Sequence, residues 1–187
     1  MLEREVKIRF PDPDLARAAL AGVGAVPLRP RRLQDDTLFD TADSALRARR
    51  AVVRLRREPD RAFVTYKGPV QEGPMKMREE QETEVADADV VRRVLQEIGL
   101  QAWFRYQKFR EEFEAPGVVI ALDETPVGTY LEIEGSEEGI LTIADALGCS
   151  PADFILDSYR GLFLAFAQAH NVTARDMLFD VGDMTGA

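Results

Sequence analysis

Charged side chains alternate with apolar ones in several short segments of this chain. Strand-like alternation of this kind surrounds Glu3 and Glu5, Arg54 and Arg56, Lys67, Glu80 and Glu82, Lys108 and Arg110, and Glu132 and Glu134. Because successive side chains of a β-strand point to opposite faces, each pair is expected on one face, with Val, Leu, Ile, Phe and Tyr on the other. Carboxylates suit Mg²⁺ or Mn²⁺, whereas Arg and Lys suit phosphate oxygens. The pairs therefore predict a site for a polyphosphate with divalent cations.

A closed sheet would bring these separate pairs together. A solvated sheet face explains any one charged segment, but it explains the whole set less well. An antiparallel sheet of about eight strands can close like a barrel, and its inward positions then converge on one axis. If the apolar faces pack outward against helices, the charged faces line the interior, where burial is costly unless a ligand or metal completes the pairing. We therefore expect a charged tunnel.

The alternation and its interruptions predict the elements that position these residues. Strands are expected over residues 2–10, 36–40, 51–57, 62–67, 75–85, 103–115, 118–123 and 130–135. Helices are expected from a cap at Asp14 to about Gly22, and over residues 87–100, 140–147 and 158–170. The predicted fold class is α+β: an eight-stranded antiparallel β tunnel, closed like a barrel, with flanking helices. We expect one domain over residues 1–170 and a weakly ordered C-terminal tail over residues 171–187.

Composition excludes several other kinds of site. Cys149 and His170 are the only cysteine and histidine among 187 residues, so neither an internal disulfide nor a His-rich zinc site is available. The net charge of −9 argues against nucleic acid and anionic membranes as partners. No signal-like start and no apolar run of ~20 residues is present, so a cytoplasmic protein is expected. A monomer and a homodimer are both compatible with the sequence.

A series of short motifs follows the order found in a known superfamily. The N-terminal Glu3-Arg4-Glu5-Val6-Lys7 matches an ExExK signature. Further matches are Phe39-Asp40-Thr41, Arg54-Leu55-Arg56, Tyr66-Lys67-Gly68, Arg78 to Glu82, Lys108-Phe109-Arg110, Leu122-Asp123, Gly128, Glu132-Ile133-Glu134 and Ser158-Tyr159. Together they span residues 3–159. The chain thereby resembles the CYTH superfamily, the triphosphate tunnel metalloenzymes that include thiamine triphosphatases, inorganic triphosphatases and class IV adenylate cyclases.

This resemblance implies roles for individual residues. It implies that a triphosphate is contacted by Lys7, Arg54, Arg56, Lys67, Lys108 and Arg110. It implies that one or two Mg²⁺ or Mn²⁺ ions are held by Glu3, Glu5, Asp123, Glu132 and Glu134, with Glu80 and Glu82 as further contributors. Catalysis would then rest on Glu3, Glu5 and Lys7, with the metal orienting water and Lys7 helping to position it.

For some residues a structural role is also compatible with the sequence. Asp123 can equally well start the turn before Pro126. Tyr159 is expected to pack in the core with the aromatic side chains of its helix, and Arg160 beside it has no predictable direction. The arginines at positions 47, 49 and 50 are expected to form a solvated rim that attracts anions.

Three functions are compatible with such a tunnel. The first is metal-dependent hydrolysis of inorganic triphosphate, thiamine triphosphate or a nucleoside triphosphate. The second is cyclisation of ATP to cyclic AMP and pyrophosphate, which uses the same charged lining with a different phosphorus facing the nucleophile. The third is a non-catalytic polyphosphate-binding module, which would tolerate the loss of carboxylates; both outer glutamate pairs are present in this chain.

Overall fold

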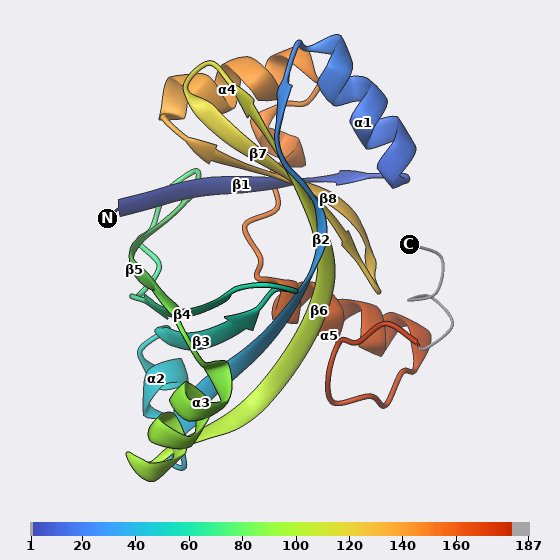
Figure 1. The fold of residues 1–187 in the computed structure, drawn as a ribbon. Coiled ribbons are helices and arrows are strands. Elements are labelled where there is room, and N and C mark those ends of the chain that lie inside the picture. The colour runs from blue at the N-terminus through green and yellow to red at the C-terminus, as the bar shows by residue number, and fades with distance from the viewer. Residues whose placement is uncertain (1, 181–187) are drawn as a thin grey trace.

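Eight strands form one antiparallel sheet that returns to its starting strand (Figure 1). The computed structural model describes residues 2–180. The strands are β1 (Leu2–Phe10), β2 (Val26–Thr41), β3 (Val52–Arg57), β4 (Ala62–Lys67), β5 (Lys76–Val85), β6 (Leu100–Ala115), β7 (Val118–Thr125) and β8 (Gly128–Gly135). They pair in the order β1-β5-β4-β3-β2-β6-β7-β8, and β8 pairs with β1 again. The predicted fold class is confirmed.

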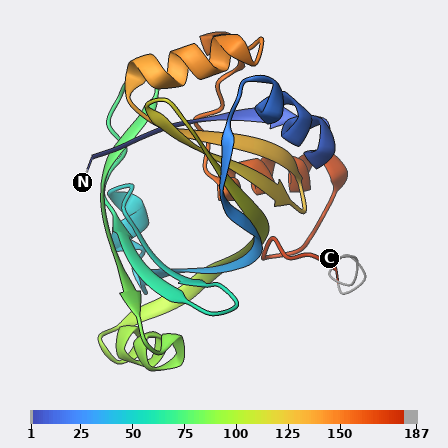
Figure 2. The ribbon, with the colours of Figure 1, turned by 45° about the horizontal axis from the view of Figure 1, so that its top comes forward.

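Five α-helices flank this ring of strands. They are α1 (Pro13–Gly22), α2 (Ala45–Ala48), α3 (Ala88–Glu97), α4 (Glu137–Ala146) and α5 (Tyr159–His170). Figure 2 shows α1 and α4 together on one side of the ring and α3 on the opposite side. None of the helices in residues 2–180 is long and apolar enough to cross a membrane.

The largest apolar core lies outside the ring, between the sheet and two helices. It joins the outward side chains of β1, β7 and β8 to α1 and α4, and includes Val6, Ile8, Leu20, Ile120, Leu131, Ile133 and Ile140. In β1 these apolar residues alternate with Glu5 and Lys7, which are also buried but point the other way. Both faces of the strand are therefore buried. Helices cover the apolar face, and the ring of strands encloses the charged face.

Several predicted boundaries differ from the structure. β2 begins ten residues before the predicted start at 36, and its first part reads as a loop because Pro27 and Pro30 interrupt the alternation. Its pairing with β6 shifts register at Pro27/Arg29 and at Arg29/Arg32, as expected where proline cannot donate a ladder hydrogen bond. The cap of α1 is Asp12 and not Asp14, because the Asp12 carboxylate accepts from the Leu15 amide at 2.8 Å.

Helix α5 and the segment after it cover another part of the sheet. Tyr159 and Phe163 of α5 pack against Phe104 and Tyr106 of β6. The segment that follows α5 was predicted to be weakly ordered, yet Met177 is fully buried and its backbone pairs with β6. The free edge of β6 explains this anchoring, because β7 pairs only from residue 109 onward. Residues 181–187 of the predicted tail lie outside the described residues.

Gly135 provides a test of how tightly the ring closes beside α4. Its φ is +154°, and an added Cβ would lie 2.3 Å from the Gly117 carbonyl oxygen. We expect Gly135→Ala to lower the free energy of unfolding by about 2 kcal/mol or more, because the backbone must move and the conformation is strained. Gly22→Ala is the control, since nothing lies within 4 Å of its added Cβ. Equal urea midpoints for the two variants would contradict this account.

Candidate active site: a two-walled charged tunnel

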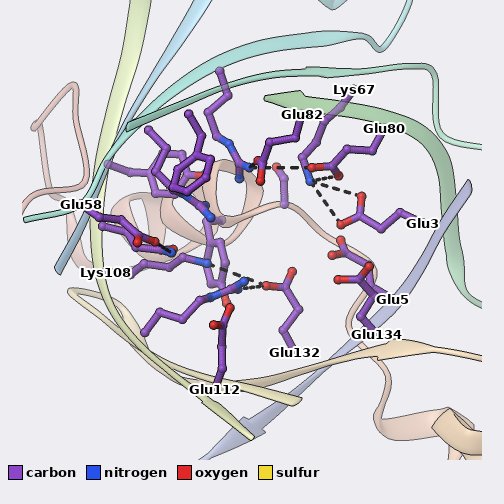
Figure 3. Close-up of a pocket in the computed structure, with 18 of the residues that line it drawn as sticks. Glu3, Glu5, Glu58, Lys67, Glu80, Glu82, Lys108, Glu112, Glu132 and Glu134 are labelled. Atoms are coloured by element: carbon purple, nitrogen blue, oxygen red, sulfur yellow. Dashed lines mark hydrogen bonds and ion pairs between the residues drawn. The ribbon is translucent and has the colours of Figure 1, made fainter. Parts of the chain in front are cut away.

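The inward side chains of the ring line a cavity of about 410 Å³. The residues that the sequence singled out and that line it are Glu3, Glu5, Lys7, Arg54, Arg56, Lys67, Glu80, Glu82, Lys108, Arg110, Glu132 and Glu134. Figure 3 shows the labelled members of this set, among them Glu3, Lys108 and Glu132, converging from different strands on one space. The structure therefore brings together all of the predicted site residues except Asp123.

The predicted carboxylate pairs and the predicted cation pairs of this tunnel come from separate groups of strands. The acidic wall consists of Glu3 and Glu5 on β1, Glu80 and Glu82 on β5, and Glu132 and Glu134 on β8, which are neighbours in the ring. The basic wall consists of Arg54 and Arg56 on β3 and Lys108 and Arg110 on β6, with β2 between them. Glu3, Glu5 and Glu134 lie across the cavity from Lys108 in Figure 3. Positive and negative side chains thus face each other across one space.

Glu134 is the least compensated carboxylate of the acidic wall. It makes no hydrogen bond or ion pair with any side chain in residues 2–180. Burial, together with the negative charges of Glu3, Glu132 and Glu5, raises the pKa of Glu134 to about 7. Burial also raises the pKa of Glu3, with the nearby Glu80 adding to the effect. Negative charge is therefore concentrated where a cation would relieve it.

The donor atoms of the acidic wall fit a divalent cation such as Mg²⁺ or Mn²⁺. They are carboxylate oxygens, the ligands that these hard cations prefer. In residues 2–180 no three His, Cys, Asp or Glu side chains are arranged to hold a metal ion by themselves. Mg²⁺ does not require a complete cage of protein ligands, because it is commonly held by one or two carboxylates plus substrate phosphates.

Two lysines are embedded in the acidic wall. The Lys7 ammonium is buried 2.8 Å from Glu132 and 3.2 Å from Glu5. Burial lowers the pKa of Lys7, but these two carboxylates outweigh it and raise the pKa overall, so Lys7 is a permanent cation. Lys76 contacts the same Glu5, and burial together with the charge of Lys7 lowers the pKa of Lys76 to about 8. Sequence reasoning missed Lys76, although it continues the inward period of Arg78, Glu80 and Glu82.

A buried carboxylate holds the β3 half of the basic wall. Asp36 of β2 is fully buried and accepts two hydrogen bonds from Arg56, at 2.8 and 2.9 Å. Burial raises the pKa of Asp36, but Arg56 and Arg54 outweigh this and hold the pKa well below its ordinary value. Arg54 also contacts Glu82 of β5 at 3.0 Å, over the intervening strand β4. Asp36 therefore positions two arginines from behind.

Asp123 plays the same structural part for the β6 half of the basic wall. It is fully buried within β7 and accepts from Lys108 at 2.9 Å and from Arg110 at 2.7 and 2.6 Å. The hydroxyl of Tyr159 donates to it at 2.5 Å. The sequence predicts that Asp123 either ligates a metal or starts the turn before Pro126. In the structure it lies inside β7 and not among the residues that line the cavity. Its carboxylate oxygens are occupied by Lys108, Arg110 and Tyr159 behind the basic wall. The burial and the neighbouring charge of Arg110 lower the pKa of Lys108 to about 7.

Tyr159 is a lining residue that was expected only to pack in the core. It begins α5, directly after Ser158, whose hydroxyl accepts from the Gly161 amide as the helix cap. The ammonium groups of Lys7 and Lys108 lie 5.3 and 4.7 Å from the centre of its ring. The matched Ser158-Tyr159 motif was the available signal for this position. The ring therefore forms an aromatic surface beneath two of the tunnel cations.

The Asp36 cluster generates a prediction about stability. Asp36→Asn leaves the buried guanidinium of Arg56 without a carboxylate partner and Arg54 with Glu82 as its close partner, so we expect a loss of about 3–5 kcal/mol in the free energy of unfolding at pH 7. Because the folded pKa is depressed, this contribution is complete above the ordinary aspartate pKa of ~4 and declines as the pH falls below it. Urea unfolding should show the gap between wild type and variant narrowing from pH 6 to pH 3. A gap independent of pH would contradict the charge pairing.

Comparisons with known proteins agree with this architecture. A family model described as the CYTH domain matches residues 1–148. A protein of Methanocaldococcus jannaschii named as a candidate adenylate cyclase is 28% identical over 176 residues, covering 87% of this chain and all 100% of that protein.

Solved structures share the fold. That of a candidate adenylate cyclase from Vibrio parahaemolyticus has a TM-score of 0.76 at 19% identity, covering 88% of this chain and 98% of that chain. That of a candidate adenylyl cyclase from Hippeastrum, described as revealing a dominant triphosphatase activity, has a TM-score of 0.64 at 20% identity, covering 87% of this chain and 95% of that chain. The family match spans all eight strands, β1 to β8, and with them both tunnel walls. The resemblance read from the motifs is confirmed, and the chain belongs to the CYTH domain family.

Proposed function

We propose that this protein hydrolyses a triphosphate-containing substrate with the help of Mg²⁺ or Mn²⁺. The observation that carries the proposal is the opposition of an acidic and a basic wall within one cavity of about 410 Å³. A phosphate chain supplies negative charge for the basic wall, and a divalent cation supplies positive charge for the acidic wall. A metal-bound triphosphate therefore satisfies both walls at once, which neither a simple anion nor a metal alone does.

In the tunnel as described, the two walls partly satisfy each other. Lys67 contacts Glu80 at 2.5 Å and Glu3 at 3.2 Å, and Arg110 contacts Glu132. Binding of the substrate would exchange these pairs, because phosphate oxygens take over the cations. The released carboxylates then become available as metal ligands. Ion pairs between nearby strands of the lining thus keep it charged without leaving its charges uncompensated.

The roles of the residues follow from where they lie. Arg54, Arg56, Lys108 and Arg110, with Lys7 and Lys67, bind the phosphate oxygens and stabilise charge that develops on the transferred and leaving groups. Glu3, Glu5, Glu132 and Glu134 hold the cation, with Glu80 and Glu82 as further contributors. When bound, a divalent cation neutralises phosphate charge and lowers the pKa of a coordinated water. The Lys7 ammonium, a donor fixed by Glu5 and Glu132, positions the attacking water.

A second candidate function is ATP cyclisation. The relatives from M. jannaschii and V. parahaemolyticus are named as candidate adenylate cyclases, which is the observation that favours it. The described triphosphatase activity of the Hippeastrum relative favours hydrolysis. The retention of six glutamates on the acidic wall argues against a binding module without catalysis, for which a basic wall alone would be sufficient.

Product analysis distinguishes these candidates. The protein is incubated with Mg²⁺ or Mn²⁺ and with inorganic triphosphate, thiamine triphosphate or ATP, and the products are assayed for orthophosphate, pyrophosphate and cyclic AMP. We expect orthophosphate and no cyclic AMP. Cyclic AMP with stoichiometric pyrophosphate would establish the cyclase instead, and tight binding without turnover under either cation would establish a binding module.

Glu134→Gln is the sharpest variant for testing the acidic wall. Because Glu134 makes no ion pair in the described part of the chain, its neutralisation removes a metal ligand without leaving a buried cation unpaired. We expect turnover to fall by about 100-fold or more at saturating substrate, while the urea midpoint is unchanged or rises as like-charge repulsion is relieved. Glu79→Gln makes the same chemical change at an exposed position of β5 and is the control. Full activity of Glu134→Gln at limiting metal would refute the assignment.

A further inference from the structure

A second cavity, of about 750 Å³, adjoins the charged tunnel. The two cavities share lining residues, among them Arg54, Lys67, Tyr106 and Tyr159. We call this second cavity the vestibule and define it by the residues that line it alone, chiefly Leu38, Val52, Met75, Trp103 and Arg160. Its volume lies within the range of small-molecule sites, ~300–1,000 Å³. A ligand whose phosphates lie in the tunnel can therefore extend into the vestibule.

The vestibule differs from the tunnel in its chemistry. The tunnel is lined almost entirely by charged groups, whereas aliphatic side chains and an indole line much of the vestibule. The guanidinium carbons of Arg47 and Arg160 lie 4.4 and 4.8 Å from the centre of the Trp103 ring. Indole and guanidinium groups both offer flat surfaces on which nucleobases stack. This combination suits a planar ring system more than another phosphate.

The charge of the vestibule also indicates which kind of planar ring it binds. Arg47 is paired with Asp40, but Arg160 makes no ion pair with any carboxylate in residues 2–180. The lining of the vestibule holds seven cationic side chains against two carboxylates, those of Glu72 and Asp157, so positive charge is in excess. Burial and the charge of Arg47 also lower the pKa of Arg160. A cationic ring is therefore disfavoured next to Trp103, and a neutral planar base is favoured.

We infer that the vestibule binds the base and ribose of a nucleoside triphosphate, with the base stacked on the surface formed by Trp103 and Arg160 and the phosphates in the tunnel. The inference rests on the proposed function of the tunnel as a triphosphate site. It ranks the substrates by their organic parts. Inorganic triphosphate leaves the vestibule empty, and thiamine triphosphate places a cationic thiazolium near Arg160, so ATP gains most from this cavity.

Kinetics with matched substrates test the inference. The values of kcat/KM for ATP, thiamine triphosphate and inorganic triphosphate are measured for wild type, Trp103→Leu and Trp103→Phe. We expect Trp103→Leu to lower kcat/KM for ATP about tenfold, through KM, because base stacking is lost. The value for inorganic triphosphate should stay within about twofold, and Trp103→Phe should retain most of the ATP value. An equal loss for ATP and inorganic triphosphate in Trp103→Leu would overturn the inference.

Arg160→Gln tests the charge independently of the aromatic ring. Loss of this cation should raise kcat/KM for thiamine triphosphate relative to ATP severalfold, since the repulsion of the thiazolium is weakened. An unchanged ratio would contradict the charge argument. If wild type turns over none of the three substrates, the proposed function fails, and the vestibule is judged by binding alone.

Fluorescence supplies that binding readout. Trp103 is the only tryptophan of the chain, so its emission reports on the vestibule directly. The β,γ-imido analogue of ATP should change the emission saturably, and imidodiphosphate, which carries the same bridge without a base, should change it much less. Free N-acetyltryptophanamide serves as the control for absorption by adenine. Equal changes with both compounds, or no change with either, would overturn the inference.

Discussion

Compensation of charge inside a closed ring of strands is the constraint on which this structure depends. Desolvating a charged side chain costs several kcal/mol unless a partner of opposite sign is close. The tunnel meets this requirement with contacts between nearby strands along its lining, such as Lys7 of β1 with Glu132 of the adjacent β8 at 2.8 Å, and Arg54 of β3 with Glu82 of β5 at 3.0 Å. In the proposed function these pairs become the basis of binding, because a phosphate would replace the carboxylate as the partner of each cation and a divalent cation would bind the carboxylate.

Aspartates and glutamates compensate the positive charges of the tunnel in different ways. Asp36 and Asp123 are completely buried and lie behind the basic wall, where a short side chain keeps the carboxylate close to its own strand. The glutamates reach further and keep some access to the cavity, from 5% side-chain exposure for Glu5 to 38% for Glu82. The aspartates therefore hold the cations in place whether or not a ligand is bound, and the glutamates are the groups that can change partners.

The outward core makes this arrangement possible. In most small domains the apolar faces of a sheet point toward a common interior, but here α1 and α4 cover them from outside. The interior of the ring can therefore be charged, because the apolar side chains are buried on its outside. Where α5 closes one part of the ring, Tyr159 belongs both to an aromatic cluster and to the lining. The adjoining vestibule around Trp103 has more apolar side chains in its lining than the tunnel, and we infer that substrates with different organic parts are distinguished there.

The sequence by itself determined the alternation, and with it most of the strands, the composition of both walls and the family. Alternation is a local property, so Glu3 with Glu5 and Arg54 with Arg56 could be assigned to strand faces without knowledge of their neighbours. The start of β2 could not be predicted, because Pro27 and Pro30 interrupt the alternation. They fit into a strand only through shifts in the register of its pairing with β6. The order of strands around the ring and the position of Asp123 behind the wall were decided by tertiary structure alone. These depend on which segments become neighbours, and no spacing along the chain records that.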